Sequence, residues 1–401
     1  MARTVEQMRH WHGPALLSYG FRPFFLGAAL WAVIAMLLWV PMMTGGVTLP
    51  TAFDPVSWHA HAFLFGYLLA VVAGFLLTAV PNWTGRLPIV GWPLALLFAL
   101  WIAGRAAVAL SSYLPPFATA LIDLAMPVAL TAVIAREIIA GRNWRNLMVL
   151  GMLVLIMIGD AVFHWEAASG AYPAQGYGLR IGLGAGILMI SVIGGRVVPS
   201  FTRNWLAKQN ATTLPVPPMQ RFDKIALLAM LVALTGWVAM PDARWVAALL
   251  AVAGVLHILR LARWAGRWTL AEPLIAVLHV AYAFVPLGAM ALALEILIPG
   301  TAGRGTVQHL WMAGAIGLMT LAIMTRATLG HTGQPLTATG GTVMIYGALI
   351  LAVVLRVFAG VWPGLATPFY WAAAVLWVTA FLGFAIHYGR LLLLSRSSAS
   401  D

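Results

Sequence analysis

The sequence WHAHAFLFGYLLAVVAGFLLTAV, at residues 58 to 80, decides how the rest of the chain is interpreted. It is long enough to cross a bilayer as a helix, because about 20 apolar residues span roughly 30 Å of hydrocarbon. Two histidines, His59 and His61, open it. Histidine is costly within a membrane and is a frequent ligand of iron and copper. The stretch therefore predicts a transmembrane helix that begins at a redox cofactor site.

The whole chain has the composition of an integral membrane protein. Of its 401 residues, 62% are hydrophobic and only 8% are charged, a balance unsuited to a soluble domain. Long apolar runs recur, whereas the short alternating strands of an outer-membrane barrel do not appear. The expected fold class is all-α, a polytopic protein with twelve transmembrane helices in the lipid bilayer. The expected spans are residues 24–42, 58–80, 91–110, 116–139, 146–168, 180–198, 223–240, 243–263, 272–298, 307–327, 341–361 and 367–393.

Charge and cysteine content exclude several function classes. The net charge of +12 does not indicate nucleic-acid binding, because the basic residues are dispersed through short loops. The absence of cysteine excludes disulfides, thiolate ligation of haem and cysteine-ligated iron–sulfur clusters. Any metal must therefore be held by histidine, methionine, carboxylate or backbone groups.

The basic residues also predict the orientation. Of the 23 Lys and Arg residues, only Arg105, Arg180, Arg244, Arg304 and Arg356 fall on the outer side of this topology. By the positive-inside rule, both termini are expected to be cytoplasmic.

The longest hydrophilic connection, residues 199–224, is rich in proline and resembles a linker. We therefore expect a single membrane domain made of two six-helix halves, residues 1–198 and 225–401, joined by a cytoplasmic linker.

Four histidines fall at one depth on the outer side of this topology. His59 and His61 lie in the first two turns of the second span, His164 lies about one turn from the end of the fifth, and His309 lies in the first turn of the tenth. We expect these four to bind a metal or cofactor. On a regular helix His59 and His61 point about 200° apart, so one of them is expected to face a different partner.

Two carboxylates, Asp160 and Glu166, lie at the same level as these histidines. They are the candidate catalytic groups, because a carboxylate there could accept protons, orient an imidazole or bind a metal.

A second group of histidines lies in the inner half of the topology. His257, His279 and His387 fall within about 12 Å of the cytoplasmic edge, and His331 lies in the loop after the tenth span. His279 is expected to be a cofactor ligand, because an unpaired imidazole at its depth would cost several kcal/mol. For His257 a snorkelling or capping role is the simpler interpretation.

Two inner arginines, Arg22 and Arg326, would suit haem propionates, although the positive-inside rule alone also accounts for their charge.

Several motifs together resemble the NnrS family. They are FRPFF at 21–25, WHAH at 58–61 with FG at 65–66, AGFLLTAVPNWTG at 73–85, GRVVPSFTRN at 195–204, LH at 278–279, His309, and MTRATLGHTG at 324–333. The resemblance implies a twelve-helix bacterial inner-membrane protein that binds haem b and, in some members, copper, with a role in nitric oxide metabolism and resistance to nitrosative stress. It carries over to this chain the histidines His59, His61, His164, His279, His309 and His331. The family often has an acidic residue directly after the His-Ala-His motif, whereas this chain has Ala62.

Histidine placement and family resemblance together predict a two-site haem protein that reduces NO to N2O. The outer group is the expected NO site, and His279 with His331 or His387 is the expected electron-transfer haem site. Quinol is the expected donor, because no soluble redox domain or c-type haem motif is present. Two other classes stay open: a transporter of copper, haem or a small solute, and a non-catalytic protein that responds to NO.

Overall fold

The computed structural model describes residues 11–86 and 88–394. Within these ranges, twelve helices are long and apolar enough to cross a membrane, and no strand occurs, which confirms the expected fold class. The chain ends, whose side of the membrane the sequence predicts, lie outside the described residues.

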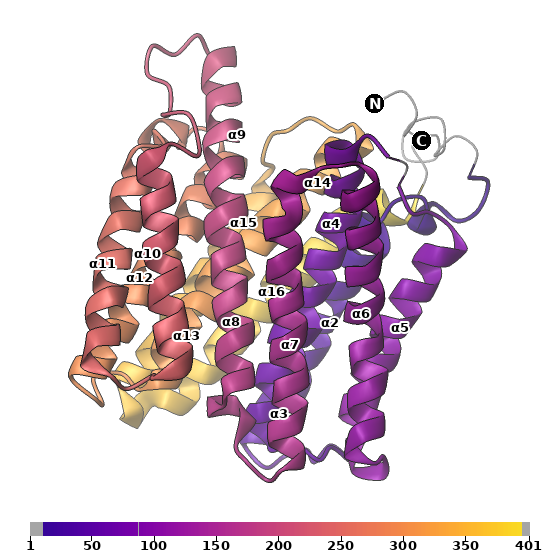
Figure 1. The fold of residues 1–401 in the computed structure, drawn as a ribbon, viewed down its shortest axis with the longest axis vertical. Coiled ribbons are helices and arrows are strands. Elements are labelled where there is room, and N and C mark those ends of the chain that lie inside the picture. The colour runs from indigo at the N-terminus through magenta and orange to yellow at the C-terminus, as the bar shows by residue number, and fades with distance from the viewer. Residues whose placement is uncertain (1–10, 87, 395–401) are drawn as a thin grey trace. The chain divides into compact units, whose positions relative to one another are not determined.

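The spans follow one another through short connections (Figure 1). They are α2 (Phe21–Met43), α3 to α4 (Pro55–Thr84), α5 (Trp92–Ala109), α6 (Pro116–Ala140), η4 and α7 (Trp144–Ala168), α8 to α9 (Tyr177–Lys208), α10 (Arg221–Ala239), α11 (Arg244–Ala262), α12 (Pro273–Leu297), α13 to α14 (Arg304–Thr332), α15 (Gly340–Val361), and η9 with α16 (Pro363–Leu393). The single-turn segment η1 (Ala15–Leu17) precedes the first span, and η3 (Ser111–Tyr113), η5 (Pro173–Gln175) and η7 (Gly266–Thr269) lie between later spans.

Internal contacts divide the chain into two compact units. Unit 1 contains Met1–Gly182, Ala327–Pro335 and Phe381–Asp401, and unit 2 contains Leu183–Arg326 and Leu336–Ala380. Each unit combines segments from before and after the proline-rich connection. The division into two six-helix halves stays a prediction. The connection itself is shorter than expected, because α9 (Gly195–Lys208) continues as a helix into the expected linker and only residues 209–220 are non-helical.

Three spans contain a π-helical segment, which is rare and often marks a functional site. These segments are η2 (Ala62–Leu68), η6 (Ile190–Gly194) and η8 (Leu310–Leu318). η2 begins directly after His61, and η8 begins directly after His309. Both histidine positions therefore stand where a helix changes its geometry.

Close packing explains the small residues of the second span. A Cβ added to Gly74, in α4 (Leu69–Thr84), would lie 2.8 Å from the ring of Phe25 on α2. A Cβ added to Gly66, in η2, would lie 2.7 Å from the indole nitrogen of Trp31, also on α2. These glycines let α2 pack closely against the second span. The contacts leave no space at these positions for a flat cofactor such as haem.

A buried polar network joins four helical segments of unit 2, namely η6, α10, α11 and α12. The fully buried Arg260 of α11 donates from Nε to Asp223 Oδ1 at 2.9 Å, and from Nη1 to the Ser191 carbonyl and the Tyr282 hydroxyl, both at 2.8 Å. His257 Nδ1 lies 2.9 Å from the same hydroxyl. His257 is fully buried, so it does not have the interfacial position that the sequence suggested. With one carboxylate and a guanidinium, the network suits bracing of α10, α11 and α12 rather than metal binding.

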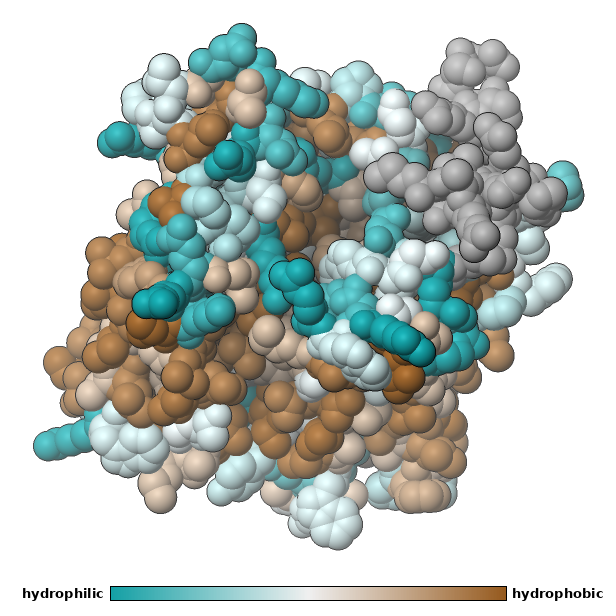
Figure 2. Space-filling view, turned by 45° about the horizontal axis from the view of Figure 1, so that its top comes forward, coloured by the Kyte–Doolittle hydropathy of each residue, from teal (hydrophilic) through white to brown (hydrophobic). Residues whose placement is uncertain are grey.

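The surface agrees with a membrane protein. Large apolar side chains are exposed along the helices, among them Leu121 on α6 at 61% and Val375 on α16 at 61% exposure. Figure 2 shows apolar residues over much of the lower part of the face in view and hydrophilic residues gathered mainly over its upper part. Such exposure is costly in water and expected against lipid tails.

Candidate metal centre

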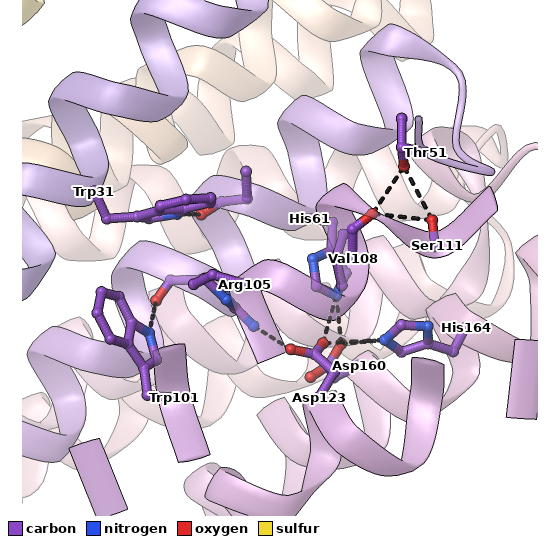
Figure 3. A network of polar contacts seen from close by, with 12 residues as sticks. Trp31, Thr51, His61, Trp101, Arg105, Val108, Ser111, Asp123, Asp160 and His164 are labelled. Carbon is purple, nitrogen blue, oxygen red and sulfur yellow. Dashed lines mark hydrogen bonds and ion pairs between the residues drawn. The ribbon is translucent and has the colours of Figure 1, made fainter. Parts of the chain in front are cut away.

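Four metal-binding side chains from three helices of unit 1 converge on one buried point (Figure 3). They are His61, Asp123, Asp160 and His164, and their four ligand atoms all lie within 4.8 Å of one another. His61 Nε2 is 2.9 Å from Asp123 Oδ2 and 3.0 Å from Asp160 Oδ1. His164 Nε2 is 3.0 Å from Asp123 Oδ2 and 3.8 Å from Asp160 Oδ1.

Local sequence places each of these groups. His61 ends α3 (Pro55–His61), whose N-cap is Asp54: its Oδ1 accepts hydrogen bonds from the amides of Val56 and Ser57, each at 3.0 Å. Asp160 and His164 are one turn apart on α7 (Leu147–Ala168), so they face the same side of that helix.

Two tryptophans hold the π-helical segment that follows His61. Trp31 Nε1 on α2 donates to the Ala62 carbonyl at 2.8 Å, and Trp101 Nε1 on α5 donates to the Gly66 carbonyl at 3.0 Å (Figure 3). A π-helix disrupts the regular i to i−4 hydrogen bonds, and these indoles satisfy carbonyls that lie in the segment. The direction of His61 is thus fixed by hydrogen bonds from two neighbouring helices.

Arg105 compensates part of the negative charge of the cluster. Its Nη2 donates to Asp123 Oδ1, the oxygen that does not contact the histidines. The two carboxylates and this guanidinium leave one negative charge in excess when both imidazoles are neutral. A buried site with this charge attracts a cation.

Aromatic rings enclose the cluster. The centroids of Phe53, Phe65 and Phe163 lie 5.8, 5.4 and 5.5 Å from that of the His61 ring, respectively. The four cluster residues are between 1% and 6% exposed. Bulk water is therefore kept from the carboxylates, and electrostatic interactions within the cluster are correspondingly strong.

The donor set fits a metal ion. A tetrahedral site with bonds of about 2.1 Å has ligand atoms about 3.4 Å apart, and an octahedral one about 3.0 Å apart. The four separations between a ring nitrogen and a carboxylate oxygen, 2.9 to 3.8 Å, bracket both values. Asp160 Oδ2 is buried without a hydrogen-bond partner among the described residues, which is costly unless a cation or donor faces it. A haem does not fit between the His61 and His164 rings, because Asp123 contacts both ring nitrogens there.

Two residues that the sequence grouped with this site are oriented elsewhere within unit 1. The His59 ring stacks on Trp39, with centroids 4.0 Å apart, in agreement with the expectation that His59 and His61 face different partners. Glu166, a candidate catalytic group, accepts hydrogen bonds from the amides of Tyr177 and Gly178 at 2.6 and 3.2 Å. It therefore caps the start of α8 (Tyr177–Met189), whereas Asp160 lies in the cluster.

The predicted ligands of unit 2 have partners of their own. His309 Nδ1 donates to the Gly305 carbonyl, one turn earlier in α13 (Arg304–His309). His279 Nε2 lies 2.8 Å from the hydroxyl of Thr202. Of the four outer histidines expected from the sequence, the cluster contains His61 and His164, His59 lies in unit 1 with other partners, and His309 belongs to unit 2.

The remaining predicted cofactor residues also make protein contacts. His331 lies against the rings of Tyr19 and Phe21, at 5.4 Å from each centroid, and His387 lies edge-on to Tyr388. Arg22 donates to the carbonyls of residues 391, 392 and 394, which capping of α16 explains without a propionate.

Arg326 stacks on Phe201, with its guanidinium 4.1 Å from the ring centroid. This contact is a cation–π interaction, so it accounts for the position of the arginine without a haem propionate.

Sequence reasoning missed Asp123 and did not connect Arg105 with it. Asp123 lies inside the apolar run LIDLAMP at 121–127, and Arg105 lies near the end of the third span. An ionisable residue inside a span is expensive and is a functional candidate by itself. The sequence contains this signal at Asp123. The pairing of Asp123 with Arg105, however, depends on how α5 packs against α6.

Comparison with known protein families shows to which family the chain belongs. The model of the NnrS family, described as NnrS protein, matches residues 15–396, which is nearly the whole chain and includes all four cluster residues. A search of proteins with curated functions found no match. Because the family match covers far more than half of the sequence, the chain belongs to the NnrS family.

Proposed function

We propose that this protein is a membrane-bound nitric oxide reductase whose reaction centre is a metal ion held by His61, Asp123, Asp160 and His164. The reaction would be 2 NO + 2 e⁻ + 2 H⁺ → N2O + H2O. Membership of the NnrS family supports the connection with nitric oxide. The observation that carries the proposal is the convergence of two imidazoles and two carboxylates on one buried, water-excluded point.

The donor set limits the choice of metal. Two imidazole nitrogens with two carboxylate oxygens suit divalent iron or copper, and either ion could exchange electrons with NO. Thiolate-dependent alternatives are excluded, because the chain has no cysteine. When bound, such an ion would supply a coordination site for NO and a route for electrons.

The protein's own groups have distinct parts in this proposal. The ring nitrogens of His61 and His164 and the carboxylates bind the ion, with Asp123 held in place by Arg105. Asp160 Oδ2 has no other partner among the described residues, so it is the group best placed to bind or to hold a proton. The phenylalanine walls exclude water yet admit NO, which is small, neutral and soluble in apolar surroundings.

Haem belongs to this proposal as a further cofactor, because the family resemblance implies it. Its ligands would lie outside the metal cluster, where the carboxylates occupy the space between the histidines. Catalysis, the number of haems and the presence of copper are parts of the proposal.

The test begins with protein purified in detergent. Metal analysis and a pyridine haemochrome assay give the metal and haem content per chain, and an NO electrode with gas chromatography measures NO loss and N2O formation. The proposal expects stoichiometric iron or copper that is lost in His61→Ala, and one N2O for every two NO consumed.

The rival functions give different results in the same experiment. Protein that binds NO without forming N2O in the presence of a reductant would be a non-catalytic NO-responsive protein. Protein in vesicles that moves copper or haem across the bilayer, and consumes no NO, would be a transporter. Wild-type protein without iron or copper after metal-replete expression would overturn the proposed centre.

A further inference from the structure

A second candidate site lies in unit 2, in a pocket of about 680 Å³. Four residues of α12, Ala276, His279, Val280 and Ala283, line one wall with the spacing of a single helix face. The end of α11, segment η7 and the loop after α9 form the rest of the lining. The volume lies within the range of about 300 to 1,000 Å³ that is usual for small-molecule sites.

The hydrogen bonds around His279 fix which of its nitrogens faces outward as an acceptor. Thr202 has one hydroxyl hydrogen, and it donates that hydrogen to the Val198 carbonyl at 2.9 Å. The contact of 2.8 Å between Thr202 Oγ1 and His279 Nε2 must then have the histidine as donor. Neutral His279 therefore carries its hydrogen on Nε2, and its Nδ1 has a free lone pair.

That lone pair is buried and without a partner among the described residues. His279 is 8% exposed, and its Nδ1 makes no hydrogen bond in the part of the chain that the structure describes. Such a group costs about 1 to 3 kcal/mol if it stays unsatisfied. Because His279 lines the pocket, the pocket is suited to a ligand that brings a hydrogen-bond donor.

The rim of the pocket combines lipid-facing and cationic residues. Val280, within a membrane span, is 39% exposed, and Leu270 is 76% exposed, so a ligand can enter from the bilayer. Arg263 donates from Nη2 to Gln220 Oε1 at 2.6 Å, and its Nη1 is buried without a hydrogen-bond partner among the described residues. Arg267 stacks on Trp268, with its guanidinium 5.0 Å from the ring. The pocket thus suits an amphiphile whose head group offers both a hydrogen-bond donor, for His279 Nδ1, and an acceptor, for Arg263 Nη1.

We infer that this pocket binds a membrane quinol, with one hydroxyl of its head group donating to His279 Nδ1. The inference rests on the proposed function for its electron acceptor. A quinol that loses two electrons and two hydroxyl protons becomes a quinone, and two NO molecules that take up both become N2O and water. One proton leaves through His279, whose ring can bind it at Nδ1, and the overall reaction is QH2 + 2 NO → Q + N2O + H2O.

The backbone close to His279 Nδ1 decides against a haem as the ligand of this pocket. A Cβ on Gly266 would lie 2.6 Å from His279 Nδ1, so the chain of η7 closes one side of this nitrogen. A porphyrin ligated through Nδ1 needs clearance on every side of the ring nitrogen, so the residues here do not fit a haem.

The test measures binding of decylubiquinone to the full-length protein by quenching of tryptophan fluorescence. His279→Gln is expected to weaken binding about tenfold, in proportion to one lost hydrogen bond. Ala283→Phe, which fills the pocket and leaves His279 unchanged, is expected to abolish binding even if His279→Gln fails to fold. Trp245→Phe, at the other end of α11, is the control and should leave the affinity unchanged.

Two results would overturn the inference. One is wild-type affinity for decylubiquinone in both pocket variants. The other is haem content that disappears in His279→Gln and Ala283→Phe, with a haem spectrum that decylubiquinone does not alter. Failure of the proposed function is distinguishable, because Asp160→Asn should lose NO consumption and keep quinone binding; a wild-type protein that binds decylubiquinone but reduces no NO refutes the reductase alone.

Discussion

Replacing Asp160 with asparagine separates metal binding from fold stability. Asparagine has the shape of aspartate, and its carbonyl oxygen can still accept the hydrogen bond from His61, which Asp160 Oδ1 receives at 3.0 Å. The substitution removes one negative charge and leaves the neighbouring helices in place. Asp160 is 1% exposed, so solvent does not screen the change.

The expected loss of metal affinity follows from charge. With Asp123, Asp160 and Arg105, the site has one negative charge in excess, which a divalent ion converts to one positive charge. In Asp160→Asn the same ion would leave two positive charges in a buried cluster. Removing one partner from a buried charged group costs about 3 to 5 kcal/mol, which corresponds to an affinity lower by about two to nearly four orders of magnitude.

In the absence of metal, Asp160→Asn is not expected to lower the thermal stability of the protein. Without a cation, and with both imidazoles neutral, the wild-type cluster buries one negative charge in excess, which Asp160→Asn removes. The melting temperature of the metal-free protein should therefore stay the same or rise, while the stabilisation on adding metal should largely disappear.

Anaerobic titration with Fe(II) against a competing chelator, combined with thermal unfolding, measures both quantities. Glu166→Gln is the matched control, because Glu166 lies on the same helix and caps α8; its metal affinity should equal that of the wild type. An Asp160→Asn protein that binds Fe(II) with unchanged affinity would refute the assignment of Asp160 as a ligand.

Three further substitutions test the surroundings of the site. Arg105→Met leaves Asp123 without its buried cation, so the metal-free protein should lose about 3 to 5 kcal/mol of stability in denaturant titrations, and saturating metal should restore part of it; equal stability with the wild type would argue against the pair. His59→Ala removes a ring stack worth about 0.5 to 1.5 kcal/mol and should keep the full metal content, as measured by mass spectrometry. Loss of metal in this variant would show that His59 is a ligand. Trp101→Phe leaves a carbonyl of η2 without its donor, so thermal unfolding should show a loss of about 1 to 3 kcal/mol, together with weaker metal binding if η2 orients His61.

Much of the fold could be predicted from the sequence, because apolar run length and charge are properties of each span alone. The second span, expected at residues 58–80, is observed at Pro55–Thr84, so its position is predicted within a few residues. The sixth span was placed too short, since the polar residues after Arg196 were interpreted as a loop, whereas α9 runs to Lys208. A polar sequence does not end a helix when it projects beyond the lipid, so hydropathy alone is a poor guide there.

The site was predictable only in part. Depth along a helix follows from residue number, which brought His61, Asp160 and His164 into one group. Rotation about the helix and the choice of neighbouring helix depend on tertiary packing, so Asp123 was missed and Glu166 was included. Shared depth is a necessary condition for a common site, and contact requires that the side chains also point toward one another.

Because of the π-helical segment after His61, the directions of the side chains at the start of the second span do not determine the directions of those at its end. A regular helix fixes the direction of every later side chain once the first is set, since each residue adds about 100°. The wider turn between Ala62 and Leu68 shifts that phase within the span. α3 can therefore present His61 to α6 and α7 while α4 presents its small residues to α2, and neither requirement dictates the other. Deleting a single residue from η2 would reset the phase, and the metal ligand and the packing face could then no longer both be satisfied.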